Sequence, residues 1–164
     1  MVVHAVAAEQ VEEHRAPLKR FWIERFFTSA YCRLDAAIDG ASDFTNAVAA
    51  SGAHVAYVTG RHAAMGPGSV DCLRAHGLPV PDGERVHLLL KPDFATSDDA
   101  WKLEAFARLD TLGTLVAAFD NEPAHINGYA THYPGARAVR LATDDSGRPI
   151  ALLPGVRSIA DFVR

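Results

Sequence analysis

Apolar and polar positions alternate between two patterns along the middle of the chain: short continuous apolar runs, and apolar residues at helical spacing. Four short apolar runs, rich in valine, leucine and alanine, are bounded by glycine, proline or charged residues, which is typical of buried strands. They lie at 54–58, 86–90, 115–119 and 138–141. Between them, apolar residues recur at helical spacing. This alternation of strand and helix predicts an α/β fold with a mostly parallel sheet and helices on both faces.

Cap residues mark where the predicted helices begin. Ser42 or Asp43 can cap the helix before the first strand, because a short polar side chain accepts a hydrogen bond from a free N–H at a helix start. Ser97 or Asp98 can do the same before the third strand. Pro123 fits the first turn of the helix that follows that strand.

Both ends of the chain are also expected to be helical. Residues 3–30 carry apolar faces, and Pro17 is expected to start a second helix within them. Residues 159–163 suggest a short C-terminal helix. Two aromatic pairs in the N-terminal segment are expected to pack on the sheet or on a neighbouring helix: Phe21-Trp22 and Phe26-Phe27.

Composition narrows the class of protein. A chain of 164 residues is expected to form one domain, divided into a helical segment 1–40, a core 41–145 and a tail 146–164. A net charge of −4 argues against a nucleic-acid-binding surface, and no apolar run is long enough to span a membrane. The two cysteines, far apart and in no metal spacing, favour the reducing cytoplasm.

Polar residues follow the first and third strands where a parallel sheet would place a ligand. Thr59 and the N–H of Gly60 can hold an anionic oxygen, although a Thr-Gly pair after a strand is also a common turn. Asp120 can hold Mg²⁺ with water, or it can cap the next helix.

Lysines and histidines supply the remaining candidates. Lys91 or Lys102 can bring an ammonium group to a phosphate, and the alternative for each is an ordinary surface lysine. The eight histidines show no metal-ligand spacing on a helix or hairpin, so they are expected at the surface or behind a site.

Taken together, these residues resemble the motifs of the haloacid dehalogenase (HAD) superfamily, which consists largely of phosphatases. Val58-Thr59-Gly60-Arg61 resembles its second motif and Phe119-Asp120-Asn121-Glu122 its fourth. The third motif is a lysine, for which Lys102 is slightly preferred over Lys91. The similarity covers roughly residues 35 to 145 and implies a Rossmannoid sheet, a Mg²⁺ cofactor and a small phosphorylated substrate.

The resemblance also assigns roles to these residues. Thr59, Lys102 and Asp120 would be catalytic. Thr59 would bind the phosphoryl group together with Gly60, Arg61 and Lys91. Asp120 would ligate Mg²⁺ with help from Asn121. The helical segment 1–40 would be the remnant of a substrate-selecting cap.

One motif of the family is missing. Its first motif is an apolar strand followed by Asp-x-Asp, whose first aspartate attacks phosphorus, and no Asp-x-Asp precedes Thr59. In the family that strand lies between the strands of the second and fourth motifs. Its loss would leave two edges unpaired and roughly 10 Å apart.

Three explanations fit the missing motif. The favoured one is that the natural protein begins upstream of Met1, so that this chain is truncated and has little or no turnover. Alternatively, another segment fills the central position, or the chain is a degenerate member of the family. The leading hypothesis for the function is the phosphohydrolase core. The second hypothesis is a non-catalytic domain that binds phosphate or metal or has a regulatory role. A nucleotide-binding α/β module is the third, and it is weakened by the absence of a glycine-rich phosphate loop.

Overall fold

The computed structural model describes residues 8–163, and the side chains from residue 14 onward. Its elements follow one another as the alternating pattern predicted. They are α1 Ala8–Phe26, the 3₁₀ helix η1 Tyr31–Leu34, α2 Ala41–Ala50, β1 Val55–His62, η2 Ala63–Met65, α3 Gly66–Ala75, β2 Val86–Lys91, α4 Asp98–Leu112, β3 Ala117–Asp120, α5 Pro123–His132, β4 Arg137–Leu141 and β5 Arg157–Ile159. The predicted α/β class is confirmed.

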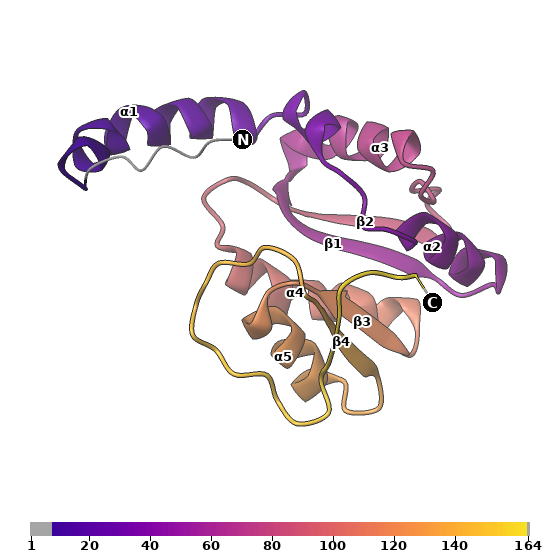
Figure 1. The fold of residues 1–164 in the computed structure, drawn as a ribbon. Coiled ribbons are helices and arrows are strands. Elements are labelled where there is room, and N and C mark those ends of the chain that lie inside the picture. Colours follow the sequence, from indigo (N-terminus) through magenta and orange to yellow (C-terminus); the bar gives the residue numbers. More distant parts are fainter. Residues whose placement is uncertain (1–7, 164) are drawn as a thin grey trace.

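The strands form two parallel sheets where a single sheet was expected (Figure 1). One holds β1 and β2, and the other holds β3, β4 and β5 in that order. Val55 to Thr59 pair in register with Val86 to Leu90, and Ala117 to Asp120 pair with Arg137 to Arg140. Among residues 8–163, no strand lies between β1 and β3 to join the sheets.

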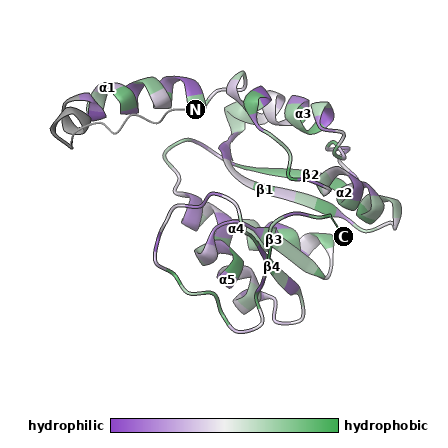
Figure 2. Ribbon diagram, in the orientation of Figure 1, coloured by the Kyte–Doolittle hydropathy of each residue, from purple (hydrophilic) through white to green (hydrophobic). Residues whose placement is uncertain are grey.

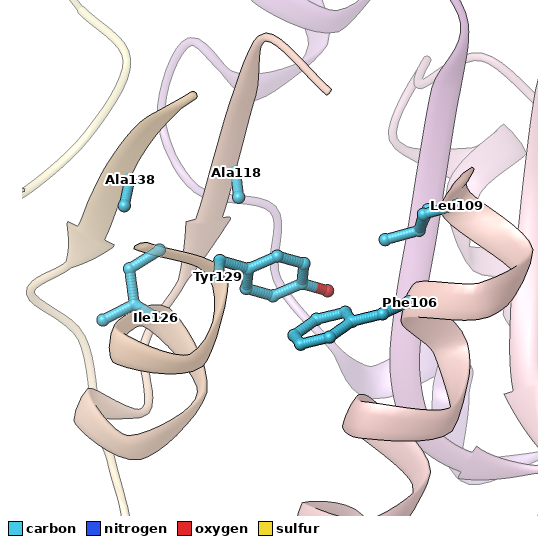
Figure 3. Packing of buried hydrophobic residues seen from close by; sticks show 6 residues of the cluster. All are labelled: Phe106, Leu109, Ala118, Ile126, Tyr129 and Ala138. Atoms are coloured by element: carbon cyan, nitrogen blue, oxygen red, sulfur yellow. The ribbon is translucent and has the colours of Figure 1, made fainter. Parts of the chain in front are cut away.

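The main core lies where α4 and α5 cover β3 and β4 (Figure 3). Its buried members are Phe106, Leu109, Ala118, Ile126, Tyr129 and Ala138. Ala56 and Val58 of β1 and Leu89 of β2 pack against the same cluster. Side chains therefore hold the two sheets together, although no backbone ladder in the described part of the chain does so.

A second apolar contact lies on the opposite face of β3. The ring of Phe119 contacts Phe44 of α2 and Phe162 near the C-terminus, with centroids 5.3 and 5.2 Å apart. Ala118 and Phe119 are neighbours in a strand, so their side chains point to opposite faces. Apolar side chains thus cover both faces of the region between β1 and β3.

The predicted cap of α4 is confirmed, and that of α2 is wrong. Ser97 Oγ accepts a hydrogen bond from the Ala100 N–H at 3.2 Å. In contrast, α2 begins at Ala41, after Gly40 with φ 75°. Ser42 lies inside the helix, and its hydroxyl donates to the Gly77 carbonyl at 2.8 Å. A side chain at Gly40 would meet the Phe162 backbone at 2.8 Å, so packing of the C-terminal segment fixes this helix start.

The N-terminal helix differs from expectation in two ways. α1 is one helix with Pro17 inside it, although proline removes one backbone hydrogen bond and its ring crowds the carbonyl four residues earlier. Phe21 and Trp22 are 56% and 47% exposed, since α1 lies away from both sheets (Figures 1 and 2). Trp22 stacks on Phe26, with centroids 4.8 Å apart, instead of on the sheet. The expected start at residues 3–7 lies outside the described part.

The predicted C-terminal helix is wrong. Residues Arg157–Ile159 form β5, which adds to β4 in parallel. The Ile159 carbonyl accepts from the Ala142 N–H at 2.8 Å. Five residues are too few to nucleate a helix unaided, whereas the edge of β4 offers ready backbone partners. Between residues 8 and 163, no helix is long and apolar enough to cross a bilayer.

Candidate functional site

The candidate residues gather where β1 and β3 end. Thr59, Gly60 and Arg61 lie within β1, which continues to His62, and not in the loop that was expected. The ladder with β2 is irregular between Thr59 and His62. A side chain on Gly60 would overlap the Asp98 carboxylate, so the exposed Asp98 side chain would have to move to make room for it. Asp120 is the last residue of β3.

Lys102 joins the two sheets at this point. Its ammonium group donates to Asp120 Oδ2 at 2.8 Å and to the Val58 carbonyl at 2.7 Å. The side chains of Lys102 and Asp120 are only 12% and 6% exposed. Lys102 is therefore not a surface lysine. It forms a buried ion pair that bridges β1 and β3 next to Thr59.

The second carboxylate oxygen of Asp120 is also engaged. Oδ1 accepts from the Glu122 N–H at 2.9 Å and lies 3.6 Å from His125 Nδ1. The residue that caps α5 is Glu122, so the alternative in which Asp120 caps that helix is wrong. Burial by itself would raise the pKa of Asp120, but the nearby His125 imidazole and the Lys102 ammonium group together hold it below the ordinary value.

His125 extends this network toward the surface. Its Nε2 lies 2.8 Å from Asp99 Oδ1, and its pKa is raised, mainly by the nearby Asp120 carboxylate and against the opposing effect of burial. Asp99 is also bound by Arg148 Nη1 at 2.8 Å, which with His125 lowers its pKa to about 2. The result is a carboxylate–imidazole–carboxylate chain leading out from Asp120.

Sequence reasoning did not single out His125. Its position supplied a usable signal, because it lies in the first turn of the helix that follows Asp120. A side chain there faces back toward the end of the preceding strand. Asp99 could be paired with it only once the packing of α4 against α5 was known.

Arg61 and Lys91 are each held by a carboxylate elsewhere. The Arg61 guanidinium binds the Asp35 carboxylate and donates to Ser69 Oγ at 3.2 Å. The Lys91 ammonium binds Asp98 Oδ1 at 2.8 Å and the Thr96 carbonyl at 2.9 Å. Of the two candidate lysines, Lys102 is the one beside Asp120.

Of the two candidate metal ligands, Asp120 lies at the site and the Asn121 side chain is bonded elsewhere. Asn121 Nδ2 donates to the Asp144 carbonyl, which fixes the amide toward the following loop. No group of three or more histidine, cysteine, aspartate and glutamate side chains within residues 8–163 is placed to hold a metal. Asp120 thus offers one carboxylate. This fits Mg²⁺ only where water and phosphate oxygens complete the coordination.

A cavity of about 240 Å³ opens beside the end of β1. Its polar wall includes Thr59, Gly60 and Arg61, and Phe26 and Phe27 lie across from them at the end of α1. The N-terminal segment therefore contributes apolar surface to the same cavity as the predicted phosphate-binding residues.

The chain was compared with protein-family models, with curated proteins and with solved structures. None of these three comparisons found a match. The function of the chain therefore has to be inferred from its own residues.

Proposed function

We propose that this chain is the core of a HAD-like, Mg²⁺-dependent phosphohydrolase, with little or no turnover on its own. The observation that carries the proposal is the buried Lys102–Asp120 pair at the ends of β1 and β3. It joins the lysine and the aspartate that the resemblance assigns to one site, and it lies next to the threonine of the same motif set.

Each residue has a defined task in this proposal. Thr59 and the N–H of Gly60 bind phosphate oxygens. Lys102 balances the charge of the phosphoryl group and positions Asp120. Asp120, held ionised by its low pKa, is the protein ligand for Mg²⁺, and Mg²⁺ supplies charge neutralisation when it is bound.

Turnover requires a nucleophile that residues 8–163 do not place at the site. Asp35 and Asp98, the carboxylates that line the cavity, already hold Arg61 and Lys91. Within the same residues, no strand between β1 and β3 presents a further side chain. Binding without chemistry is therefore the expected behaviour of this chain.

The second candidate is a non-catalytic phosphate-binding or regulatory domain. This candidate is favoured because the described residues include no central strand. They therefore supply groups that could bind phosphate, but no nucleophile that could attack it. Both candidates predict phosphate binding, and a measurable Mg²⁺-dependent rate would single out the phosphohydrolase.

The test combines a rate and a binding measurement on the 164-residue chain. Hydrolysis of p-nitrophenyl phosphate is followed with and without Mg²⁺, and phosphate binding is measured by calorimetry. We expect no rate above buffer, and phosphate binding that Thr59→Val weakens at least tenfold. Asp71→Asn, which alters an exposed carboxylate on α3, should change neither result.

Three outcomes test the two candidates. A Mg²⁺-dependent rate that Asp120→Ala abolishes would overturn the expectation of an inactive chain. Phosphate binding without any hydrolysis is the result that both candidates predict for this chain. If the chain bound neither phosphate nor Mg²⁺, both candidates would be contradicted.

A further inference from the structure

The cavity beside the end of β1 has an aromatic wall that phosphate binding does not use. Phe26, Phe27 and Tyr31 line this cavity together with Thr59 and Gly60. Their rings come from the end of α1 and the start of η1. A phosphate ion has no apolar part that could cover them. The cavity thus combines a polar and an apolar region, as sites for small organic molecules do.

The rings of this wall are held in place by two further aromatic side chains. Trp22 stacks on Phe26 with centroids 4.8 Å apart, and it meets Phe27 edge-on at the same distance. Phe94, in the segment after β2, packs edge-on against Phe27 at 4.6 Å. Because these contacts already restrict the rings, little side-chain freedom remains to be lost when a ligand binds.

The geometry of the wall suits a planar guest. Phe26 and Phe27 lie at 81° to one another, with centroids 5.1 Å apart. Trp22 covers one face of Phe26, so the opposite face or the edge of that ring is left to meet the cavity. Aromatic rings attract one another in stacked and edge-to-face arrangements, beyond the effect of burial. An aromatic guest can form such pairs, whereas a saturated ring of similar size cannot.

The volume of the cavity limits the guest to one ring. It is about 240 Å³. An apolar cavity of about 150 Å³ accommodates benzene, so the space here suffices for one six-membered ring and a group of the size of phosphate. Sites for drug-sized ligands begin at about 300 Å³. A second ring would have to extend into solvent.

The charges at the cavity give a further reason to expect contacts beyond phosphate. Arg61 is already bound to Asp35, and Lys91 is bound to Asp98. Paired cations attract a phosphate group less than free ones do, so phosphate by itself should bind weakly. A ligand that also buries an apolar ring gains affinity because that ring leaves water.

We propose that this cavity binds the phosphate monoester of a single aromatic ring, with its phosphate at Thr59 and Gly60 and its ring against Phe26 and Phe27. This inference rests on the proposed function, because it takes the phosphate site from it and adds the class of ligand. The aromatic wall then decides which phosphate esters the chain selects.

The test compares three ligands by calorimetry in buffer that contains Mg²⁺ and no other phosphate. They are inorganic phosphate, phenyl phosphate and cyclohexyl phosphate. We expect phenyl phosphate to bind roughly tenfold or more tightly than inorganic phosphate, because its ring leaves water. It should also bind at least about threefold more tightly than cyclohexyl phosphate, since only the aromatic ring can pair with the rings of the wall.

Two variants of α1 test where the ring binds. Phe26→Leu keeps an apolar side chain but removes one aromatic ring from the cavity wall. The ratio of phenyl phosphate affinity to inorganic phosphate affinity should fall at least about threefold in this variant. Phe21→Leu is the matched control, because Phe21 is an exposed ring of the same helix that lies outside this cavity. It should leave the ratio as in wild type.

A free aryl phosphate and a phosphotyrosine side chain share this chemistry. N-acetyl-O-phosphotyrosine amide, added as a fourth ligand, separates the two sources. Binding as tight as that of phenyl phosphate would identify phosphotyrosine within a peptide as a ligand of the cavity. Binding roughly tenfold weaker or more would identify a free small molecule, because the backbone of a peptide would then be excluded.

Three results would overturn the inference. If phenyl phosphate binds no more tightly than inorganic phosphate or cyclohexyl phosphate, the aromatic wall does not select the ligand, and the proposed function stands without it. If Phe26→Leu leaves the affinity ratio unchanged, the ring binds elsewhere. If none of the ligands binds, the phosphate site itself is contradicted, and the proposed function fails together with the inference.

Discussion

At the scale of single residues, Lys102 has the largest structural role in the site. Its ammonium group links the Val58 carbonyl to the Asp120 carboxylate, and both members of the ion pair are buried. Such a pair contributes little net stability relative to apolar residues, but removal of one partner leaves an isolated buried charge. This asymmetry makes Lys102 testable.

Lys102→Met should lower the free energy of unfolding by about 3 kcal/mol, because Asp120 loses its nearest cation. The measurement is urea unfolding at pH 7. Arg74→Met is the control, since Arg74 and Asp71 form an ion pair with side chains 62% and 42% exposed. That variant should lose less than about 1 kcal/mol.

A double variant shows whether the loss of stability comes from the unpaired charge or only from altered packing. Lys102→Met combined with Asp120→Leu removes both charges, so it should be more stable than Lys102→Met alone. If the double variant is less stable than the single one, the ion pair is not the source of the loss.

His125 should make stability depend on pH. Its folded pKa is raised by the nearby Asp120 carboxylate and by Asp99, with burial and Lys102 opposing them. The resulting stabilisation is complete below the ordinary histidine pKa of about 6.5, and it is lost as pH rises through the folded value. Wild-type stability should therefore fall between pH 6 and pH 9 by more than that of His125→Gln.

Unfolding in urea at both pH values checks this sign. The lowered pKa values of Asp120 and Asp99 act at the other end of the range, where stability is lost as pH falls below about 4. If the free energy of unfolding fell equally in wild type and His125→Gln between pH 6 and pH 9, a group other than His125 would cause the pH dependence.

At the scale of elements, the position of the helices depends on close contacts that the sequence does not reveal. Gly68 lies in α3, and a side chain there would overlap the backbone of Ser29. At this contact α3 packs closely against the segment between α1 and η1. Glycine inside a helix normally costs stability, so the contact explains why alanine does not stand at this position.

Gly68→Ala should therefore destabilise the chain by about 1–3 kcal/mol, even though alanine favours helix formation. For a chain of this size that corresponds to a melting temperature lowered by roughly 2–10 °C. Gly135→Ala is the control, because no heavy atom lies within 4 Å of the position that its Cβ would take. An unchanged melting temperature for Gly68→Ala would contradict the packing described here.

The elements that could be predicted from the sequence are those whose signals are local. Ser97 caps its helix as expected, and the central strands lie within four residues of their apolar runs. Residues 157–159 were misassigned because a distant partner, β4, offers them a backbone ladder. Ser42 was misassigned because its hydroxyl bonds to Gly77 and a contact at Gly40 sets the helix start.

At the scale of the whole molecule, the fold consists of two parallel sheets joined by side chains. The sequence predicted the alternation of strand and helix along the described residues. The resemblance assigned Lys102 and Asp120, 18 residues apart, to one site, and the structure shows a 2.8 Å hydrogen bond between them that was not predicted. The sequence could not predict that Arg61 and Lys91 would be held by Asp35 and Asp98, because those pairings depend on tertiary packing.

Binding of Mg²⁺ by Asp120, where β1 and β3 end, is the property on which the proposed function depends most. It can be measured by a Mg²⁺ titration followed by NMR of the backbone amides, on wild type and Asp120→Asn. We expect saturable shifts at Thr59, Asp120 and Asn121, with weak, roughly millimolar affinity, because the one carboxylate already pairs with Lys102. These shifts should vanish in Asp120→Asn. Equal shifts in both proteins, or none in wild type, would contradict a Mg²⁺ site at Asp120.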